Sequence, residues 1–252
     1  MIKNKLIIPS HKSLNFIKQY FKKLNLMKFL KDDGQTFKPD LRDLYRIHQF
    51  IILNKRMTAL EFGCGWSTII IKHALEINKK KYVKNISKLR KKDFFELFTI
   101  DNQKKFLKKT QIKTKRILGK EKKVNFIFSE CVMTKFNRRF ASEYKKLPSI
   151  NPDFVYLDGP DPLSVKDSIN GFNTRHLELM PMSCDLLKFE HFLCPGTLIL
   201  IDGRTANARF LKENFQRKWK YIHDVKNDEN LFYLDEKPLG PINKLQLKFY
   251  KN

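Results

Sequence analysis

The chain lacks the features that mark membrane, secreted and disulfide-stabilised proteins. None of its apolar runs approaches membrane-spanning length, and its first residues lack the apolar core of a signal peptide. The four cysteines, Cys64, Cys131, Cys184 and Cys194, form no C-x-x-C pair and no zinc-binding spacing. We therefore expect reduced thiols and a cytoplasmic protein.

Acidic residues are scarce in the first part of the chain. The sequence has 51 Lys and Arg against 26 Asp and Glu, a formal charge of +25. Residues 151–252 hold 14 of each kind, so the whole excess lies in residues 1–150. A basic half of this kind can bind nucleic acid. The excess of basic residues can also result from a drift of the whole composition towards Lys, Ile, Asn and Phe. We favour this second explanation.

A short glycine motif organises the rest of the sequence. The stretch Leu60-Glu-Phe-Gly-Cys-Gly-Trp-Ser-Thr68 indicates a buried strand that ends in a tight turn and is followed by a helix. Glu61 precedes the first glycine, and Thr68 stands where a dinucleotide-binding fingerprint has its third glycine. A carboxylate at this place favours a ligand with a cationic centre over a dinucleotide pyrophosphate.

This stretch resembles the first motif of class I S-adenosylmethionine-dependent methyltransferases, in which an acidic residue precedes a G-x-G turn. The resemblance implies an α/β fold: a Rossmann-like, seven-stranded, mostly parallel sheet with helices on both faces and an antiparallel C-terminal hairpin. It covers residues 55–252 and leaves residues 1–54 as an N-terminal helical extension. It also implies S-adenosylmethionine as the cofactor, bound by Glu61, Gly63, Gly65, Trp66 and Ser67.

Acidic residues follow the other strands that the apolar pattern predicts. Strands are expected over residues 94–100, 124–128, 152–158 and 197–201, followed by Asp101, Glu130, Asp158 and Asp202. Parallel strands bring their carboxyl ends to one edge, where ligands bind. Asp101 suits the hydroxyls of a ribose. The resemblance implies that Glu130 contacts adenine and that Asp158 binds the cofactor beside the methyl group to be transferred.

Methyl transfer requires a positioned acceptor and a group that removes its proton. Asp158, Asp161 and His176 are the candidates, although His176 also suits a solvated loop. In catechol and sugar O-methyltransferases, which the chain resembles, acids after the fourth and fifth strands hold magnesium. The resemblance thus implies a Mg²⁺ site at Asp158 and Asp202, with Gly203 where that family has a further Asp or Asn. Alternatively, Asp202 caps a turn.

The remaining pattern predicts helices and a few further strands. Helices are expected over residues 10–31, 41–53, 103–118, 135–146, 177–193 and 206–215, the first of them ended by Asp32-Asp-Gly34. Residues 219–225, 231–234 and 245–250 are strand-like. The N-terminal helices could cover the cofactor pocket or form a homodimer surface.

The function we favour is methyl transfer to a small-molecule acceptor, with oxygen as the accepting atom. The basic half leaves a nucleic-acid methyltransferase open, but the fourth strand lacks the Pro-Pro-aromatic sequence used on flipped bases. Asp158-Gly-Pro-Asp-Pro162 is similar to the D-x-x-D-P loop of aminopropyltransferases such as spermidine synthase, which act on cationic amines. A non-catalytic cofactor-binding module is the last alternative.

Overall fold

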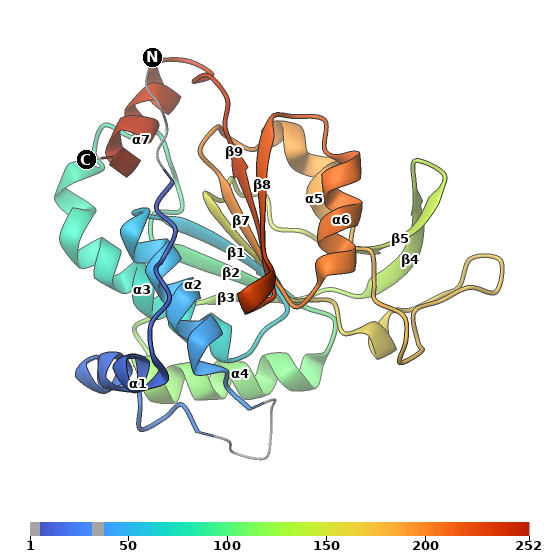
Figure 1. Ribbon diagram of the computed structural model, residues 1–252, viewed down its shortest axis with the longest axis horizontal. Coiled ribbons are helices and arrows are strands. Elements are labelled where there is room, and N and C mark those ends of the chain that lie inside the picture. Colours follow the sequence, from blue (N-terminus) through green and yellow to red (C-terminus); the bar gives the residue numbers. More distant parts are fainter. Residues whose placement is uncertain (1–5, 32–37, 252) are drawn as a thin grey trace.

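A seven-stranded sheet lies at the centre of the computed structural model, which describes residues 6–31 and 38–251 (Figure 1). The strand order is β3-β2-β1-β6-β7-β9-β8. The first five strands of this order run parallel, and β9 is antiparallel to β7 and β8. The strands are β1 (Thr58–Phe62), β2 (Glu96–Asp101), β3 (Asn125–Phe128), β6 (Phe154–Leu157), β7 (Leu198–Asp202), β8 (Trp219–Asp224) and β9 (Glu229–Leu234). The expected Rossmann-like fold with its antiparallel C-terminal hairpin is confirmed.

Helices cover both faces of this sheet. They are α1 (Leu14–Lys23), α2 (Leu41–Leu53), α3 (Trp66–Tyr82), α4 (Lys104–Leu118), α5 (Asp185–Phe189), α6 (Thr205–Asn214) and α7 (Pro241–Lys251). Because successive strand residues point to opposite faces, Ala59 joins the core beneath α2 and α3, whereas Leu60 joins the core beneath α5 and α6. The central strands are therefore apolar on both sides, and β1 and β6 are buried throughout.

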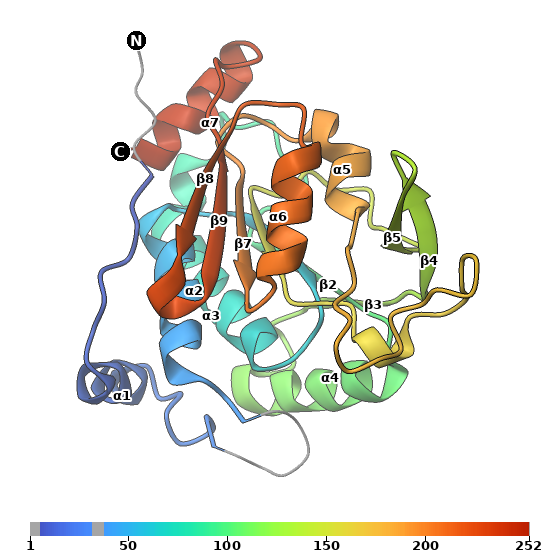
Figure 2. The same cartoon turned by 45° about the vertical axis from the view of Figure 1, so that its right-hand side comes forward.

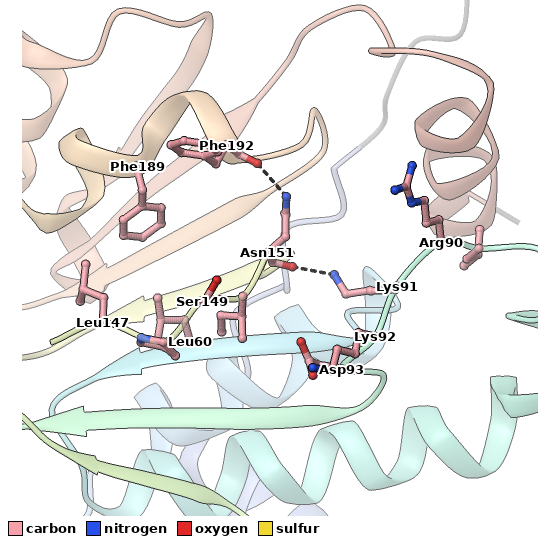
Figure 3. A pocket seen from close by; sticks show the side chains of 13 residues that line it. Leu60, Arg90, Lys91, Lys92, Asp93, Leu147, Ser149, Asn151, Phe189 and Phe192 are labelled. Atoms are coloured by element: carbon pink, nitrogen blue, oxygen red, sulfur yellow. Dashed lines mark hydrogen bonds between the residues drawn. The ribbon is translucent and has the colours of Figure 1, made fainter.

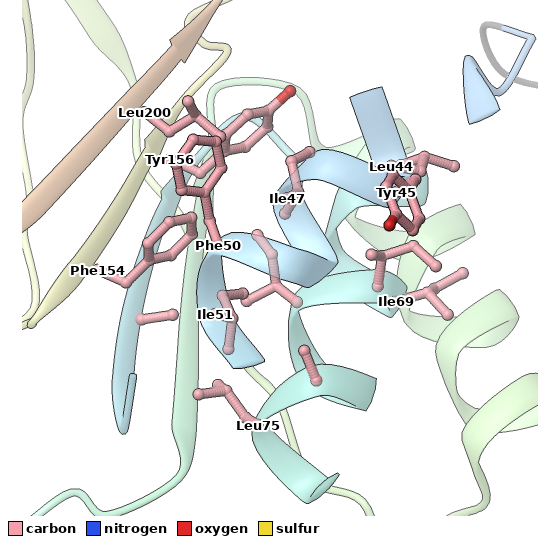
Figure 4. Close-up of a cluster of buried hydrophobic side chains, with 14 of the residues drawn as sticks. Leu44, Tyr45, Ile47, Phe50, Ile51, Ile69, Leu75, Phe154, Tyr156 and Leu200 are labelled. Atoms are coloured by element: carbon pink, nitrogen blue, oxygen red, sulfur yellow. The ribbon is translucent and has the colours of Figure 1, made fainter. Parts of the chain in front are cut away.

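The N-terminal helix α2 is built into the first of these cores. Its apolar residues recur at helical spacing, and Ile47, Phe50 and Ile51 are at most 1% exposed. They pack against side chains of the sheet such as Phe154 and Tyr156 and against α3 (Figure 4). The side chain of Asp40 caps the helix by accepting from the main-chain N–H of Arg42 at 2.7 Å. The position of α2 is thus fixed at both its face and its start.

The segment expected as a helix over residues 135–146 is instead a β-hairpin. Strands β4 (Cys131–Phe136) and β5 (Arg139–Tyr144) pair antiparallel beside the main sheet. Both residues of the turn, Asn137 and Arg138, have positive φ, at 47° and 63°. That is the geometry of the two-residue turn that matches the twist of paired strands. The helix prediction was wrong because the abundant charges hid an alternating strand pattern.

Three other expected elements also differ. The predicted helix over residues 177–193 shrinks to α5 and a single turn of 3₁₀-helix, since Pro181 interrupts its first part. The strand predicted over residues 245–250 is helix α7, which begins at Pro241 and buries residues four apart, Asn243 and Leu247. The first helix already ends at Lys23, and its predicted stop at residues 32–34 lies outside the described residues.

No helix in the described chain is long and apolar enough to cross a bilayer.

Asp153 ties β1, β6 and α7 together at the amino-terminal edge of the sheet. Its carboxylate is 2% exposed and accepts from the main-chain N–H groups of Met57 and Thr58, at 3.0 and 2.9 Å. The hydroxyl of Tyr250 donates to it at 2.7 Å. One buried side chain therefore satisfies donors from the start of β1 and from the last helix.

The substitution Asp153→Ala leaves these donors buried without an acceptor. We expect it to lower the free energy of unfolding by about 3 kcal/mol, because buried donors that lose a charged partner keep their desolvation cost. Urea denaturation followed by circular dichroism measures the change. Glu213→Ala on the exposed side of α6 is the control and should change stability by less than about 0.5 kcal/mol. Equal effects of the two substitutions would contradict the assigned role.

Candidate functional site

The loops that follow β1 and β6 touch through their backbones. Gly63 has a φ of +87°, and a Cβ built on it would lie 2.9 Å from the carbonyl oxygen of Asp158. A Cβ on Gly159 would lie 2.6 Å from the nitrogen of Gly63. Side chains at either position would force the loops apart. Since β1 and β6 are the neighbours at which the strand order reverses, the contact lies at the ligand-binding crevice of this kind of sheet.

Glu61 binds the start of helix α3 through two side-chain hydrogen bonds. It is fully buried in β1 and accepts hydrogen bonds from the hydroxyls of Ser67 and Thr68 at 2.6 and 2.7 Å. Burial raises the pKa of this carboxyl to about 7, against the opposing effect of the hydroxyl donors. Its role in the structure is to fix the glycine turn relative to α3, and it does not line the cavity described below.

Asp101 closes the other side of the glycine turn. One carboxylate oxygen accepts from the main-chain N–H of Cys64 at 3.0 Å, and the other accepts from that of Gln103 at 2.6 Å. Burial raises the pKa of Asp101, while these hydrogen bonds oppose the shift. The end of β2 is thereby joined both to the turn after β1 and to the start of α4.

A cavity of about 420 Å³ opens above these loops at the carboxyl ends of the parallel strands. Its walls come from β2, β6 and β7, from the loop after β1, and from the starts of α2, α3 and α4. Lining residues include Asp40, Asp43, Ile47, Gly63, Gly65, Trp66, Ser67, Asp101, Phe106, Tyr156, Asp158, Asp161, Asp202 and Arg204. Six aspartates face two basic side chains, Lys38 and Arg204, so the cavity favours a ligand with positive charge.

Two of these aspartates have strongly shifted pKa values. Burial raises the pKa of Asp202 to about 8, and the charges of Asp43 and Asp158 add to the shift. Burial and neighbouring acids also raise the pKa of Asp43 to about 7. The hydroxyl of Tyr156 donates to Asp202 at 3.1 Å. Near neutral pH these carboxyls can therefore both hold and accept a proton.

Arg204 anchors the loop after β6 from the opposite wall. Its guanidinium donates to the main-chain oxygen of Asp158 at 2.7 Å and lies 3.5 Å from the Asp158 carboxylate. Burial raises the pKa of Asp158, and the charge of Arg204 opposes this. Asp161 accepts from the side-chain amide of Gln103 at 2.7 Å, which connects the same loop to the end of β2.

The structure gathers most of the residues that the sequence pointed to, but not all. Gly63, Gly65, Trp66, Ser67, Asp101, Asp158, Asp161 and Asp202 all line the cavity. Glu130 lies apart from it and pairs with Lys145 and Lys166. His176 is in the exposed loop before α5, where its ring accepts from the main-chain N–H of Glu178. Neither residue shares the cavity with the rest.

Asp43 and Tyr156 line the cavity, although sequence analysis assigned neither residue to it. Asp43 stands more than a hundred residues from Asp158 and Asp202, on a helix whose pattern showed only a buried face. The acidic first turn of that helix, Asp40-Leu-Arg-Asp43, was the available signal. Tyr156 looked like one of several apolar residues of its strand, and only the topology turns its hydroxyl towards Asp202.

The residues proposed for magnesium do not form a recognisable metal-binding set. Asp202 accepts from Tyr156, and Asp158 faces the guanidinium of Arg204. Over residues 6–31 and 38–251, no group of three or more His, Cys, Asp or Glu side chains is arranged to hold a metal ion. Hard cations require several oxygen ligands, so the donor set does not fit and we derive no step through a metal.

No protein-family model matches the chain, and no curated protein sequence matches it. Among solved structures, the chain is similar to cofactor-bound Rv0187 from MTB, with a TM-score of 0.51 and 10% identity over 90% of this chain and all of that one (100%). It is also similar to the O-methyltransferase from Bacillus cereus in complex with SAH (TM-score 0.44, 13% identity, 92% and 94% of the two chains). A third is the O-methyltransferase TomG from Streptomyces achromogenes, in complex with SAM and involved in tomaymycin synthesis (0.43, 14%, 92% and 93%). The likeness to the first of these structures supports a Rossmann-like fold for this chain.

Gly63→Ala tests the contact between the two loops. We expect it to lower the free energy of unfolding by about 3 kcal/mol, since alanine meets both the left-handed backbone and the Asp158 carbonyl. Gly171→Ala is the matched control, because Gly171 has a φ of +79° and a Cβ there would contact nothing within 4 Å. It should cost about 1 kcal/mol, for the backbone alone. Equal losses in chemical denaturation would rule out crowding at Gly63.

Asp202 makes stability depend on pH in a direction that can be checked. Its pKa is about 8 in the folded chain, against 3.8 as the ordinary value. As pH rises between these values, the unfolded chain loses the proton first, so folding weakens by up to about 1.4 kcal/mol per pH unit. Asp202→Asn should remove this decline. We expect its unfolding free energy, measured from pH 4 to 8, to rise relative to the unsubstituted chain. If the unfolding free energies of the two proteins changed with pH in parallel, the raised pKa of Asp202 would be refuted.

Proposed function

We propose that this protein is an S-adenosylmethionine-dependent methyltransferase that acts on a small-molecule acceptor. The observation that carries the proposal is the joining of the Gly63–Gly65 turn to Asp101 at the floor of an acidic cavity. The turn, the start of α3 and the carboxylate after β2 meet at the reversal of strand order. This is the place where such a sheet binds nucleotide-like ligands.

The chain's own residues suit that cofactor. A Cβ on Gly65 would meet nothing within 4 Å, so the turn leaves open space beside the start of α3, where main-chain N–H groups suit a carboxylate. Asp101 offers oxygens at the end of β2 for ribose hydroxyls. Asp158 and Asp161 supply negative charge for a ligand that carries an ammonium and a sulfonium. Phe106 and Trp66 add apolar and aromatic surface to the wall.

The cofactor, when bound, supplies an activated methyl carbon, and the protein must position the acceptor and take up its proton. We assign the proton to Asp202, assisted by Asp43. The high pKa values of these carboxyls match the task near neutral pH, and Tyr156 keeps Asp202 oriented through its hydroxyl. An acceptor oxygen needs such a base, because a hydroxyl is a poor nucleophile while it keeps its proton.

Charge and enclosure support a small acceptor over a nucleic acid. The ionised aspartates of the cavity outnumber its two basic side chains and repel a polyphosphate chain, although the protein as a whole carries +25. Helix α2 of the N-terminal extension walls the cavity with Asp40, Asp43, Leu44 and Ile47 and restricts its width. A molecule of small size and neutral or positive charge fits these walls.

The same carboxylates favour a second candidate function, aminopropyl transfer to an amine. Asp43, Asp158, Asp161 and Asp202 would bind a cationic acceptor as well as they bind a cationic cofactor. The two reactions use different donors. Aminopropyl transfer requires decarboxylated S-adenosylmethionine, which has lost the carboxylate that the start of α3 would hold.

Calorimetric titration tests the proposal with three compounds: S-adenosylmethionine, S-adenosylhomocysteine and decarboxylated S-adenosylmethionine. We expect the first two to bind and to raise the unfolding free energy by about 2.7 kcal/mol at a hundred times their dissociation constants. Methyl incorporation from labelled cofactor, measured separately on small-molecule and RNA fractions of a cell extract, then identifies the acceptor class.

Asp202→Asn separates binding from turnover in that experiment. It should keep cofactor binding while the rate of methyl transfer falls by about a hundredfold, as expected for loss of a general base. Preference for the decarboxylated compound would favour aminopropyl transfer. Binding of none of the three by the folded protein would remove the proposed function.

A further inference from the structure

A second, larger cavity lies at the opposite end of the strands from the glycine turn. It has a volume of about 870 Å³ and is formed by the segments that precede β2 and β6, by the region of α5, and by Leu60 of β1 (Figure 3). Its lining residues are Leu60, Leu89, Arg90, Lys91, Lys92, Asp93, Leu147, Pro148, Ser149, Ile150, Asn151, Phe189 and Phe192. None of them contributes to the acidic cavity described above.

The connection between β3 and β6 explains why this space is open. A crossover between parallel strands usually contains a helix that covers the sheet. Here residues 129–153 form the β4–β5 hairpin and a loop, and the hairpin lies to the side of the sheet (Figure 2). Leu60 on this face of the sheet lines the hollow, and Leu147 of the loop is left 36% exposed.

The cavity has an apolar side and a cationic side. Phe189, Phe192 and Leu147 lie together on one side, and Arg90, Lys91 and Lys92 lie on the other (Figure 3). The ring of Phe192 is 77% exposed, which is unusual for a phenyl group with an apolar neighbour available. The apolar side thus presents two aromatic rings to whatever enters.

Two of the three cations are available to a ligand. Lys91 donates to the main-chain oxygen of Asn151 at 2.9 Å and lies 3.8 Å from the carboxylate of Asp153. Arg90 and Lys92 are exposed, and within the described chain neither forms an ion pair or a side-chain hydrogen bond. Asp93 is the one acidic residue of the lining, so the rim is net positive.

We propose that this cavity binds an amphipathic organic anion, meaning an apolar or aromatic body that ends in a carboxylate, sulfonate or phosphate. The body would lie against Phe189, Phe192 and Leu147, and the anionic end would lie between Arg90 and Lys92. The volume is within the range of small-molecule sites, and a mostly apolar wall with a few placed charges is their usual composition. Aromatic faces and the guanidinium both favour a flat anionic group.

The polar groups of the cavity argue against a nucleotide base as the body. The side-chain amide of Asn151 already donates to the main-chain oxygen of Phe192 at 2.7 Å. Ser149 is the other uncharged polar residue of the lining. A base would therefore bury its hydrogen-bonding edges against leucine and phenylalanine, at a cost that a hydrocarbon or simple aryl body avoids.

Fluorescence titration with two matched probes tests the proposal on the full chain. The first is 1-anilinonaphthalene-8-sulfonate, and the second is N-phenyl-1-naphthylamine, which has the same rings without the sulfonate. We expect the sulfonate to bind at one site per chain and about tenfold more tightly than the neutral probe, because two cations face the anionic end.

Substitutions then assign the binding to this cavity. The double variant Arg90→Gln/Lys92→Gln should weaken the sulfonate about tenfold and change the neutral probe less than about twofold. Phe192→Ser should weaken both probes about fivefold or more, through lost aromatic contact. Lys84→Gln/Lys88→Gln, two cations of the same basic run outside the cavity, should change neither.

Three results would overturn the proposal. The first is equal affinity of the two probes for the unsubstituted chain. The second is sulfonate binding that is unchanged in Arg90→Gln/Lys92→Gln, with circular dichroism confirming that the variant is folded. The third is a dimer in sedimentation that Phe192→Ser converts to a monomer, which would assign this face to a second copy of the chain.

Discussion

The backbone contact between the loops after β1 and β6 determines the geometry of the carboxyl edge of the sheet. Two glycines, Gly63 and Gly159, allow main chains to meet where any side chain would separate them. Asp101 and Glu61 then hold the turn from either side through its N–H groups and the hydroxyls of α3. The cavity exists because these loops are held close together at its floor and because α2 is held above them.

This arrangement brings carboxyl groups together in one cavity of a protein that has a large excess of basic residues. Six aspartates converge on one cavity, while the excess of cations lies in residues 1–150. Burial raises the pKa values of Asp43 and Asp202 into the neutral range, and the charges of neighbouring acids add to the shift. The overall charge and the charge of the site therefore have opposite signs, and only the latter bears on the choice of ligand.

The sequence was sufficient to predict the sheet, the glycine turn and the acids at the strand ends, because each depends on a local pattern. Apolar runs that end in Gly63, Asp101, Asp158 and Asp202 give both the strands and their common edge. It was not sufficient to predict the role of Asp43, because the acidic first turn of α2 is visible in the sequence but its approach to β7 depends on the fold. It also misassigned the β4–β5 hairpin and α7, in which charge and alternation obscured the true period.

The contact between Asp153 and α7 has a consequence for biosynthesis. Tyr250 donates to a carboxylate that lies 97 residues earlier in the chain, and its ring stacks over the guanidinium of Arg56 at 4.5 Å. The contacts of Tyr250 with the amino ends of β1 and β6 therefore form only after the segment that forms α7 has left the ribosome. Until then the carboxylate of Asp153 keeps only its hydrogen bonds to the start of β1, and the guanidinium of Arg56 lacks the aromatic ring that covers it.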